Sequence, residues 1–255
     1  MTTVAGRRWR FAPPLPAVLF SATILAQIAY PLTSGDGRDR LTIGVVLVGA
    51  AAAVAHALVT AGRRGAIGLV VVAGLALGAE ALGVATGVPF GHYRYAGDLG
   101  PQVGGVPWLV VAAWVSMAWP AAVVARRVVR GRVARVAVAA WALAAWDVYL
   151  DPQMVSAGHW TWAPGGYRLP GIPDVPVSNF AGWLLVAVVV AVVLQAVPAR
   201  TDAVAARPVV AFYLWVAVSS ALATAVFWHR PAVAAWGLLV MGPVAVAAAR
   251  TLRRP

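Results

Sequence analysis

The run AWDVYLDPQM, residues 145–154, contains two aspartates four positions apart at the end of a long apolar stretch. Side chains at positions i and i+4 of a helix are neighbours, so the carboxyl groups of Asp147 and Asp151 are expected to lie within one turn. Two such charges in a poorly hydrated site cannot both ionise easily, and one carboxyl should keep its proton near neutral pH. The pair therefore supplies an acid and a carboxylate base together, as a cofactor-free proton addition requires.

Three ionisable residues fall well inside apolar stretches: His56, Glu80 and Asp147. A charge at such depth is costly in a membrane, which makes each of them a functional candidate. Small residues share a helical face with Glu80 and with Asp147, and small faces favour close helix packing. We therefore expect both acids to point into the protein and towards each other. His56 has no ionisable neighbour in its stretch, which favours a buried, hydrogen-bonded histidine over a metal ligand.

A structural reading of the acids stays open, in which they are hydrogen-bonded packing groups or partners of arginines. It is stronger for Asp151, which is expected to end its helix because Pro152 follows, than for Glu80 and Asp147 together. Asp36 and Asp39 belong to a short stretch of glycines and arginines and are expected to be solvated. The four histidines show no metal-ligand spacing, so no metal site is predicted.

The composition indicates that these acids belong to a membrane protein. The chain has 255 residues, of which 62% are hydrophobic and 11% charged, well outside the range of soluble domains. The sequence predicts an all-α, polytopic membrane helix bundle formed by a single domain, residues 1–255. The basic and apolar beginning resembles a signal peptide but is expected to remain as the first helix. Eight windows have the length and apolar character of membrane spans, at roughly 13–31, 41–61, 66–86, 106–125, 133–151, 178–198, 208–229 and 231–249.

The basic residues, all of them arginine, predict the orientation. With eight spans, fifteen arginines fall on the side of the N-terminus and five on the other side. The positive-inside rule then predicts that both termini are cytoplasmic, in a protein of the plasma membrane. Because the arginines stand between apolar runs and not on one folded face, binding to nucleic acid is not expected. The absence of cysteine from the sequence excludes disulfides and cysteine-ligated metals.

Two long loops, residues 87–108 and 151–180, are expected on the non-cytoplasmic side. Both are rich in aromatic residues, glycine and proline, and loops of this kind usually carry function or fold back as a lid. The alternative is a belt of aromatic side chains at the membrane surface. Aromatic residues close to the aspartates could also stabilise a developing cation through their ring faces: Trp146, Tyr149, Trp160 and Trp162.

Four stretches resemble the membrane-bound carotenoid hydratases, which include γ-carotene 1′,2′-hydratases and bisanhydrobacterioruberin hydratases. They are PFGHYRYAGDLGPQVGGVPW (89–108), AWPAAVVARR (118–127), AWDVYLDPQMVSAGHWTW (145–162) and VPVSNFAGWLL (175–185). The resemblance implies hydration of the terminal isoprenoid double bond of a linear carotenoid. An acid protonates the alkene, a tertiary carbocation forms, and water captures it without a cofactor. It also implies a carotenoid and the lipid bilayer as partners, with other carotenoid-pathway enzymes as candidates.

Within this mechanism we expect Asp147, the deeper aspartate, to be the general acid and Asp151 to orient the attacking water as base. Glu80 is the reserve candidate for either role. The matching stretches and loops also contain the residues that we expect to bind the substrate: His92, Tyr93, Tyr95, Asp98, Trp146, Tyr149, His159, Trp160, Trp162 and Asn179.

Two other functions stay open. DVYLD is also a DxxxD pattern, and membrane prenyltransferases use such aspartates to hold Mg²⁺ and diphosphate, although no partner motif of the NDxxD type is found. A proton-coupled transporter with Glu80 and Asp147 as relays is the second alternative. It predicts broken helices near the membrane midplane and inverted repeats.

Overall fold

The computed structural model describes residues 14–253, and these residues contain eight helical segments that are long and apolar enough to cross a membrane. The expected all-α polytopic bundle is confirmed, and the protein is a multi-pass membrane protein. Arg7, Arg8, Arg10 and Arg254, which enter the predicted orientation, lie outside the described residues, as does the signal-peptide-like start before Pro14. The helices are α1 (Leu15–Ala29), α2 (Asp36–Ala61), α3 (Arg63–Thr86), α4 (Trp108–Val128), α5 (Arg132–Ser156), α6 (Val177–Ala196), α7 (Ala203–Leu222) and α8 (Pro231–Thr251).

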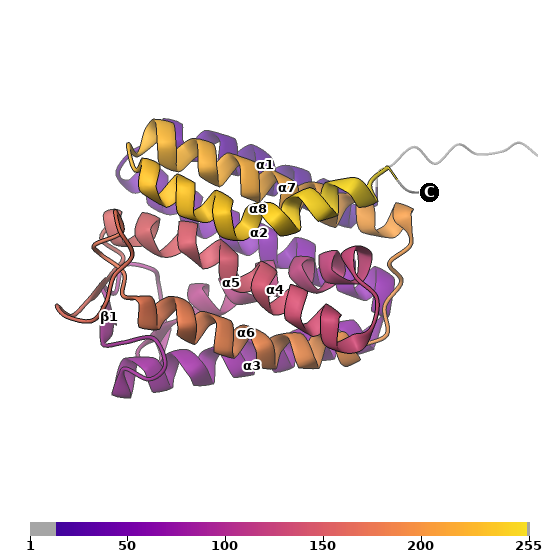
Figure 1. Ribbon diagram of the computed structural model, residues 1–255, viewed down its shortest axis with the longest axis horizontal. Coiled ribbons are helices and arrows are strands. Elements are labelled where there is room, and N and C mark those ends of the chain that lie inside the picture. The colour runs from indigo at the N-terminus through magenta and orange to yellow at the C-terminus, as the bar shows by residue number, and fades with distance from the viewer. Residues whose placement is uncertain (1–13, 254–255) are drawn as a thin grey trace, which may run out of the picture.

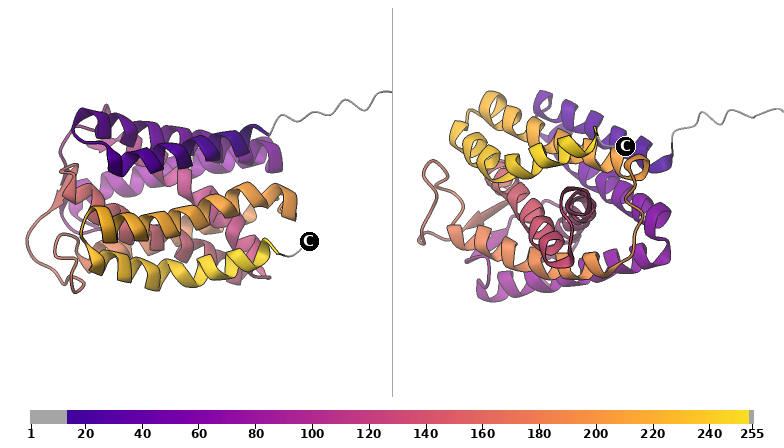
Figure 2. Two further views of the ribbon diagram at one scale, coloured as in Figure 1. Left: turned by 90° about the horizontal axis from the view of Figure 1, so that it is seen from above. Right: turned by 45° about the vertical axis from the view of Figure 1, so that its right-hand side comes forward.

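Helix α4 lies at the centre of the bundle. In α4, 83% of the apolar span is buried inside the protein, whereas the other spans range from 22% to 44%. It packs against α2, α3, α5, α6, α7 and α8, and the views in Figures 1 and 2 show the helices running side by side around it. A helix that is apolar all round is expected at such a place. The outer helices keep exposed apolar faces, which suit contact with lipid.

The two long loops fold over one end of the bundle, marked by β1 in Figure 1. Strand β1 (Tyr93–Tyr95) of the first loop pairs in antiparallel fashion with β4 (Trp160–Trp162) of the second. Strand side chains alternate between faces, so the aromatic residues at the strand ends are turned inwards while Arg94 and Thr161 are exposed. A short hairpin, β2 (Gln102–Val103) and β3 (Val106–Pro107), completes the first loop. We call residues 87–107 and 157–176 the lid.

Helix α5 is longer than the sequence predicts. Pro152 is expected to end it at Asp151, whereas the helix continues to Ser156. A proline inside a helix removes one backbone donor, and here the turn beyond it is held by other groups. The carbonyl of Pro152 accepts hydrogen bonds from the Ser156 hydroxyl at 2.8 Å and from the Arg230 guanidinium at 2.7 Å. Asp151 therefore lies within the helix and not at its end.

Helix α2 also begins earlier than predicted. Asp36 and Asp39 lie in its first turn and not in a loop. Negative side chains are favourable near a helix N-terminus because they complement the helix dipole. Both aspartates are exposed, so the expectation that they are solvated is confirmed. The end of α1 is extended by one 3-10 turn (Tyr30–Leu32), and α7 ends in a π turn (Ala223–Phe227).

Candidate active site

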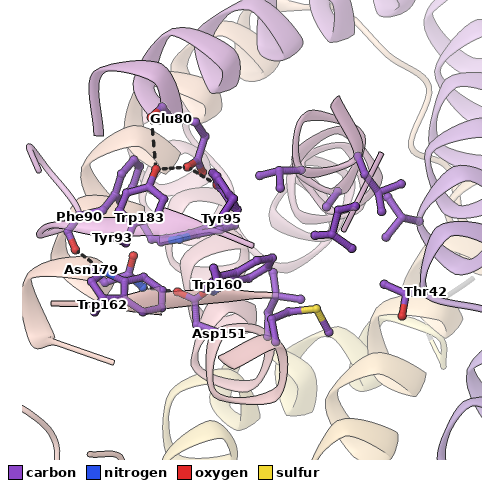
Figure 3. A pocket seen from close by; sticks show the side chains of 17 residues that line it. Thr42, Glu80, Phe90, Tyr93, Tyr95, Asp151, Trp160, Trp162, Asn179 and Trp183 are labelled. Atoms are coloured by element: carbon purple, nitrogen blue, oxygen red, sulfur yellow. Dashed lines mark hydrogen bonds between the residues drawn. The ribbon is translucent and has the colours of Figure 1, made fainter. Parts of the chain in front are cut away.

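A cavity lies between the helices directly under the lid, and Figure 3 shows its side chains. We call it the acid cavity. With its mouth it contains about 570 Å³ of space that no protein atom occupies, a size typical of small-ligand sites. Its wall is mostly apolar and aromatic. The predicted residues that line it are Glu80, Tyr93, Tyr95, Asp151, Trp160, Trp162 and Asn179.

The aspartate pair is joined by Asn179, in the first turn of α6. Its side-chain amide donates hydrogen bonds to Oδ2 of Asp147, at 2.8 Å, and to Oδ2 of Asp151. Both carboxyl groups are buried, and Asp147 is 0% and Asp151 3% exposed. The other oxygen of Asp147, Oδ1, has no hydrogen-bond partner among residues 14–253. Two carboxyl oxygens that share one amide nitrogen lie close together, so a single proton can be held between the two groups.

Glu80 has a different environment, with three donors directed at its carboxyl group. Oε2 accepts from the hydroxyls of Tyr93 at 2.5 Å and Tyr95 at 2.8 Å, and Oε1 accepts from the Trp114 indole at 2.9 Å. Donors arranged in this way stabilise a negative charge. Burial and the nearby Glu80 carboxylate raise the pKa values of both tyrosines well above their usual range. Their hydroxyls therefore remain donors at physiological pH.

The acids do not meet through direct packing of their helices. Helices α3 and α5 each pack against α4 and α6, and Figure 3 shows Glu80 and Asp151 at opposite edges of the acid cavity. The inward orientation expected for Glu80 and Asp147 is confirmed, since they are 4% and 0% exposed. The small face of α3 instead receives the lid: a Cβ added to Gly83 would come within 2.7 Å of the Phe90 ring.

Aromatic rings form the remaining walls of the acid cavity. Trp183 stacks on Trp114 with ring centroids 3.8 Å apart and an interplanar angle of 8°. On the lid, Tyr95 meets Trp160 edge to face with centroids 5.6 Å apart. The indole nitrogen of Trp160 is buried and has no partner within the described part of the chain. Such walls exclude water and present ring faces that attract a cation.

Five of the predicted binding residues lie outside the acid cavity: His92, Asp98, Trp146, Tyr149 and His159. His159 pairs with Asp98 on the lid, with Nδ1 2.7 Å from the carboxylate. His92 is exposed and lines a shallow hollow on the outer surface of the lid. Trp146 and Tyr149 face a second cavity on another side of α5. Of these two, Trp146 still contacts the wall of the acid cavity through an edge contact with Trp183, with centroids 6.2 Å apart.

Sequence reasoning missed Trp114, Trp183 and Phe90. Trp183 and Phe90 belong to the stretches that carry the family resemblance, so a signal for them was present. Trp114 lies in the middle of an apolar span, where a tryptophan is expected to face lipid or to pack in the core. An indole N–H in such a span needs an acceptor, and Glu80 is that acceptor.

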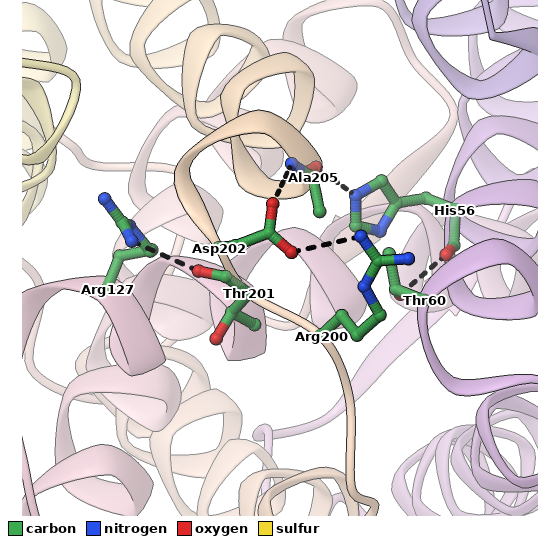
Figure 4. A network of polar contacts seen from close by, with 7 residues as sticks. All are labelled: His56, Thr60, Arg127, Arg200, Thr201, Asp202 and Ala205. Atoms are coloured by element: carbon green, nitrogen blue, oxygen red, sulfur yellow. Dashed lines mark hydrogen bonds and ion pairs between the residues drawn. The ribbon is translucent and has the colours of Figure 1, made fainter. Parts of the chain in front are cut away.

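The reading of His56 as a buried, hydrogen-bonded residue is confirmed. Its Nδ1 accepts from the Trp119 indole at 2.9 Å, so Nε2 carries the proton and donates to the Ala205 carbonyl at 2.8 Å. Figure 4 shows this contact beside those of the α6–α7 connection, in which the exposed Arg200 and Asp202 lie 3.3 Å apart. This network joins α2 to α7 at the end of the bundle opposite the lid.

Comparison with known proteins identifies a family to which the chain is similar. Residues 42–250 match the family model described as carotenoid biosynthesis protein. The chain is also similar to the bisanhydrobacterioruberin hydratase of Haloarcula japonica, with 31% identity over 132 residues. That match covers 48% of this chain and 42% of the relative, so the chain spans less than half the length of the relative. No solved structure matches the chain at a significant level. The range of the family match includes all three acids and the whole lid.

Proposed function

The chain belongs to the carotenoid biosynthesis protein family, and from this membership we propose that it is a hydratase acting on the terminal isoprenoid double bond of a linear carotenoid. The observation that carries the proposal is the acid cavity, in which two carboxyl groups, Glu80 and Asp151, line one apolar and aromatic space. The substrate would reach this cavity from the lipid bilayer, and the plasma membrane is the expected location.

The reaction adds one water molecule and changes no oxidation state of the protein. The end group (CH₃)₂C=CH–R takes a proton at its CH carbon, where the π electrons form the new C–H bond. The carbon with two methyl groups becomes a tertiary cation. A water oxygen then bonds to that carbon and loses a proton to a base, which yields (CH₃)₂C(OH)–CH₂–R. The protein must supply a proton donor, a proton acceptor and a dry wall around the cation.

The aspartate pair is the proposed proton donor. The depth of Asp147 makes it the choice for the acid from the sequence alone, but Asp151 is the member of the pair that lines the cavity. We therefore assign the direct transfer to Asp151. Asp147 is joined to Asp151 through Asn179. It shares the proton, because the two groups cannot easily be ionised at the same time. Returning the proton from the captured water to the pair closes the cycle.

Glu80 is the proposed stabiliser of positive charge and of the attacking water. Its three donors suit a carboxylate, and a carboxylate has about four acceptor sites, which leaves one for water. The faces of Trp183 and Trp160 add attraction for the cation, on the order of 2 kcal/mol for a desolvated contact. A negative charge on one edge and a proton donor on the other match the charges that this reaction develops.

The alternatives receive less support from the same cavity. Besides carboxylate-bound Mg²⁺, cationic side chains are favoured partners of diphosphate, and no arginine of the described residues lines the acid cavity. A transporter with broken helices at the membrane midplane is disfavoured because the described spans are continuous helices, apart from the π turn at the end of α7.

The test is expression in cells that accumulate lycopene, followed by mass analysis of the pigments. We expect products heavier by one or two waters, and none in cells that express the Asp151→Asn variant at the same membrane level. Unchanged pigment with lycopene and with C50 precursors would overturn the hydratase proposal. A shortened or prenylated product would support the isoprenoid-transfer alternative instead.

A further inference from the structure

We propose that the acid cavity and a second cavity between α1, α2, α5 and α7 together form one substrate passage. The acid cavity would hold the end group of the carotenoid, and the second cavity the chain behind it. This inference rests on the proposed function and names how the polyene is held. The second cavity contains about 760 Å³ of space that no protein atom occupies. Aromatic side chains form much of its wall: Tyr30, Trp146, Tyr149 and Trp228.

The two cavities share one wall. Thr42 and Val46 of α2 and Leu150 and Met154 of α5 line both of them. Each pair is spaced i and i+4, so each covers one turn of its helix. Helices α2 and α5 are not a packed pair, although α4 packs against both. These four residues border both cavities, and we call them the frame.

Thr42 of the frame lies at the end of the acid cavity away from the acids, whereas Leu150 and Met154 stand beside Asp151 on α5. Figure 3 shows Thr42 on the far side from Glu80, Asp151 and Asn179, with the lid aromatics gathered around the acids. A carotenoid end group between Glu80 and Asp151 therefore has its remaining chain directed at the α2 side of the frame. The lid blocks the other direction, because Tyr93 and Trp160 are both buried there.

The second cavity suits a flat polyene. Trp228 and Tyr30, which both line it, meet edge to face with centroids 6.1 Å apart. The helix backbone also departs from regular geometry here. The amide of Trp228 donates to the Ala223 carbonyl at 3.1 Å, which closes the π turn of α7, and Ala223 lines the cavity. A π turn inserts an extra residue into a helix and is frequent at functional sites.

This arrangement separates reactivity from selectivity. The acid cavity recognises the end group, and the frame with the second cavity recognises the long chain behind it. Val46 and Met154 are therefore specificity-determining residues. A short isoprenoid with the same end group fits the acid cavity alone and gains nothing from the second cavity.

The test uses single cysteines in a sequence that has none. Ser219→Cys reports on the second cavity, Ala113→Cys on the acid cavity, and Ser34→Cys, an exposed position between α1 and α2, is the control. Each purified variant is labelled with a small thiol reagent, with and without lycopene. At a lycopene concentration about ten times its Kd, we expect labelling of Ser219→Cys and Ala113→Cys to slow about tenfold. Labelling of Ser34→Cys should not change.

The outcomes separate this inference from the proposed function. Protection of Ala113→Cys without protection of Ser219→Cys would overturn the passage and leave the hydratase proposal intact. Protection of neither position, by lycopene or by a C50 precursor, would overturn both. A ten-carbon acyclic isoprenoid with the same end group should protect Ala113→Cys alone.

A frame variant gives an independent reading. Val46→Phe should raise the KM for lycopene several-fold more than the KM for the ten-carbon isoprenoid. Val48 lies two positions further along α2 and lines neither cavity. Val48→Phe should therefore affect neither substrate. Equal losses for both substrates in Val46→Phe would contradict the role of the frame.

Discussion

At the scale of single residues, three carboxyl groups have three different environments. Asp147 is fully buried, Asp151 lines the acid cavity, and Glu80 accepts from two tyrosines and one tryptophan. Differences of this kind allow chemically similar acids to take separate parts in one reaction. The amide of Asn179 holds the first two together. On the proposed mechanism, the site has a proton-sharing pair at one edge and a charge-stabilising carboxylate at the other.

Replacement of Asp151 by asparagine should abolish hydration, because the amide keeps the shape of the side chain but cannot deliver a proton. General acid catalysis contributes about 10²- to 10⁴-fold to rates, so product should fall at least about 100-fold. Pigment mass analysis and the amount of protein in the membrane measure the effect. Asp98→Asn is the control, since Asp98 contacts His159 outside the acid cavity. Normal hydration in Asp151→Asn together with an inactive Glu80→Gln would assign the acid role to Glu80.

Hydration in D₂O should leave one carbon-bound deuterium on the carbon next to the new tertiary alcohol. On the proposed mechanism, that carbon receives the proton from the Asp147–Asp151 pair, whose carboxyl groups exchange with solvent between turnovers. Mass spectra and proton NMR of the product locate the label. Deuterium at any other carbon, or none, would show that the cation does not form by protonation at this alkene.

At the scale of elements, the lid is held by contacts with α3. Gly83 of α3 lies against Phe90 and Tyr93 of the lid, and the Tyr93 hydroxyl reaches Glu80 one turn earlier on the same helix. The absence of a side chain at Gly83 therefore lets the lid approach the helix closely. Pairing of β1 with β4 transmits this position to Trp160 and Trp162.

Gly83→Ala should loosen the lid. The added Cβ would lie 2.7 Å from the Phe90 ring and 2.9 Å from the Tyr93 hydroxyl, and overpacking of this kind costs about 1–3 kcal/mol. We expect a lower Tm in detergent and reduced hydration. Gly78→Ala on the same helix is the matched control, because nothing lies within 4 Å of its added Cβ, and alanine is the better helix former. Equal Tm values for the two variants would contradict the packing argument.

At the scale of the whole molecule, the buried helix α4 supports both the site and the frame, while the lid covers one end of the bundle. The described arginines at the other end include Arg126, Arg127 and Arg135. Their distribution predicts that the lid faces away from the cytoplasm. A carotenoid that spans the bilayer would then have its end group near the outer surface.

This orientation can be measured with single cysteines. Ser34→Cys and Ala163→Cys lie at the lid end, and Ala134→Cys lies at the start of α5 at the opposite end; all three positions are exposed. A membrane-impermeant thiol reagent should label the first two in intact cells and the third only after lysis. These positions avoid the glycines of the turns, such as Gly97 with φ 89° and Gly131 with φ 84°, where cysteine would be strained. Labelling of Ala134→Cys alone in intact cells would reverse the orientation.

Activity should survive strong chelation and require no nucleotide. The sequence has no metal-spaced histidines and no glycine-rich phosphate loop, and three hydrogen-bond donors already point at Glu80. Hydration by purified protein with and without EDTA is the measurement, and a Mg²⁺-dependent prenyltransferase treated in parallel is the control. Activity that disappears with EDTA and returns with Mg²⁺ would favour the prenyltransferase alternative.

The sequence by itself determined the features that depend on neighbouring residues along the chain. Apolar length predicted eight spans because each span must satisfy its backbone hydrogen bonds within one helix. Because such a span is a helix, the i and i+4 spacing of Asp147 and Asp151 placed both carboxyl groups on one face. The predicted end of α5 was wrong because a side chain from a distant loop, Arg230, holds the turn after Pro152.

Only the tertiary structure decided which groups surround each acid. The partners of Glu80 come from the lid and from α4, and the amide between the aspartates comes from α6. Helix packing in a membrane depends on small faces and on polar contacts between helices that are distant in sequence. No local pattern specifies that α3 and α5 face each other across a cavity and not across a packed interface. The same packing exposes Asp151 to the acid cavity and leaves Asp147 behind it, because the two side chains, one turn apart, meet different neighbours.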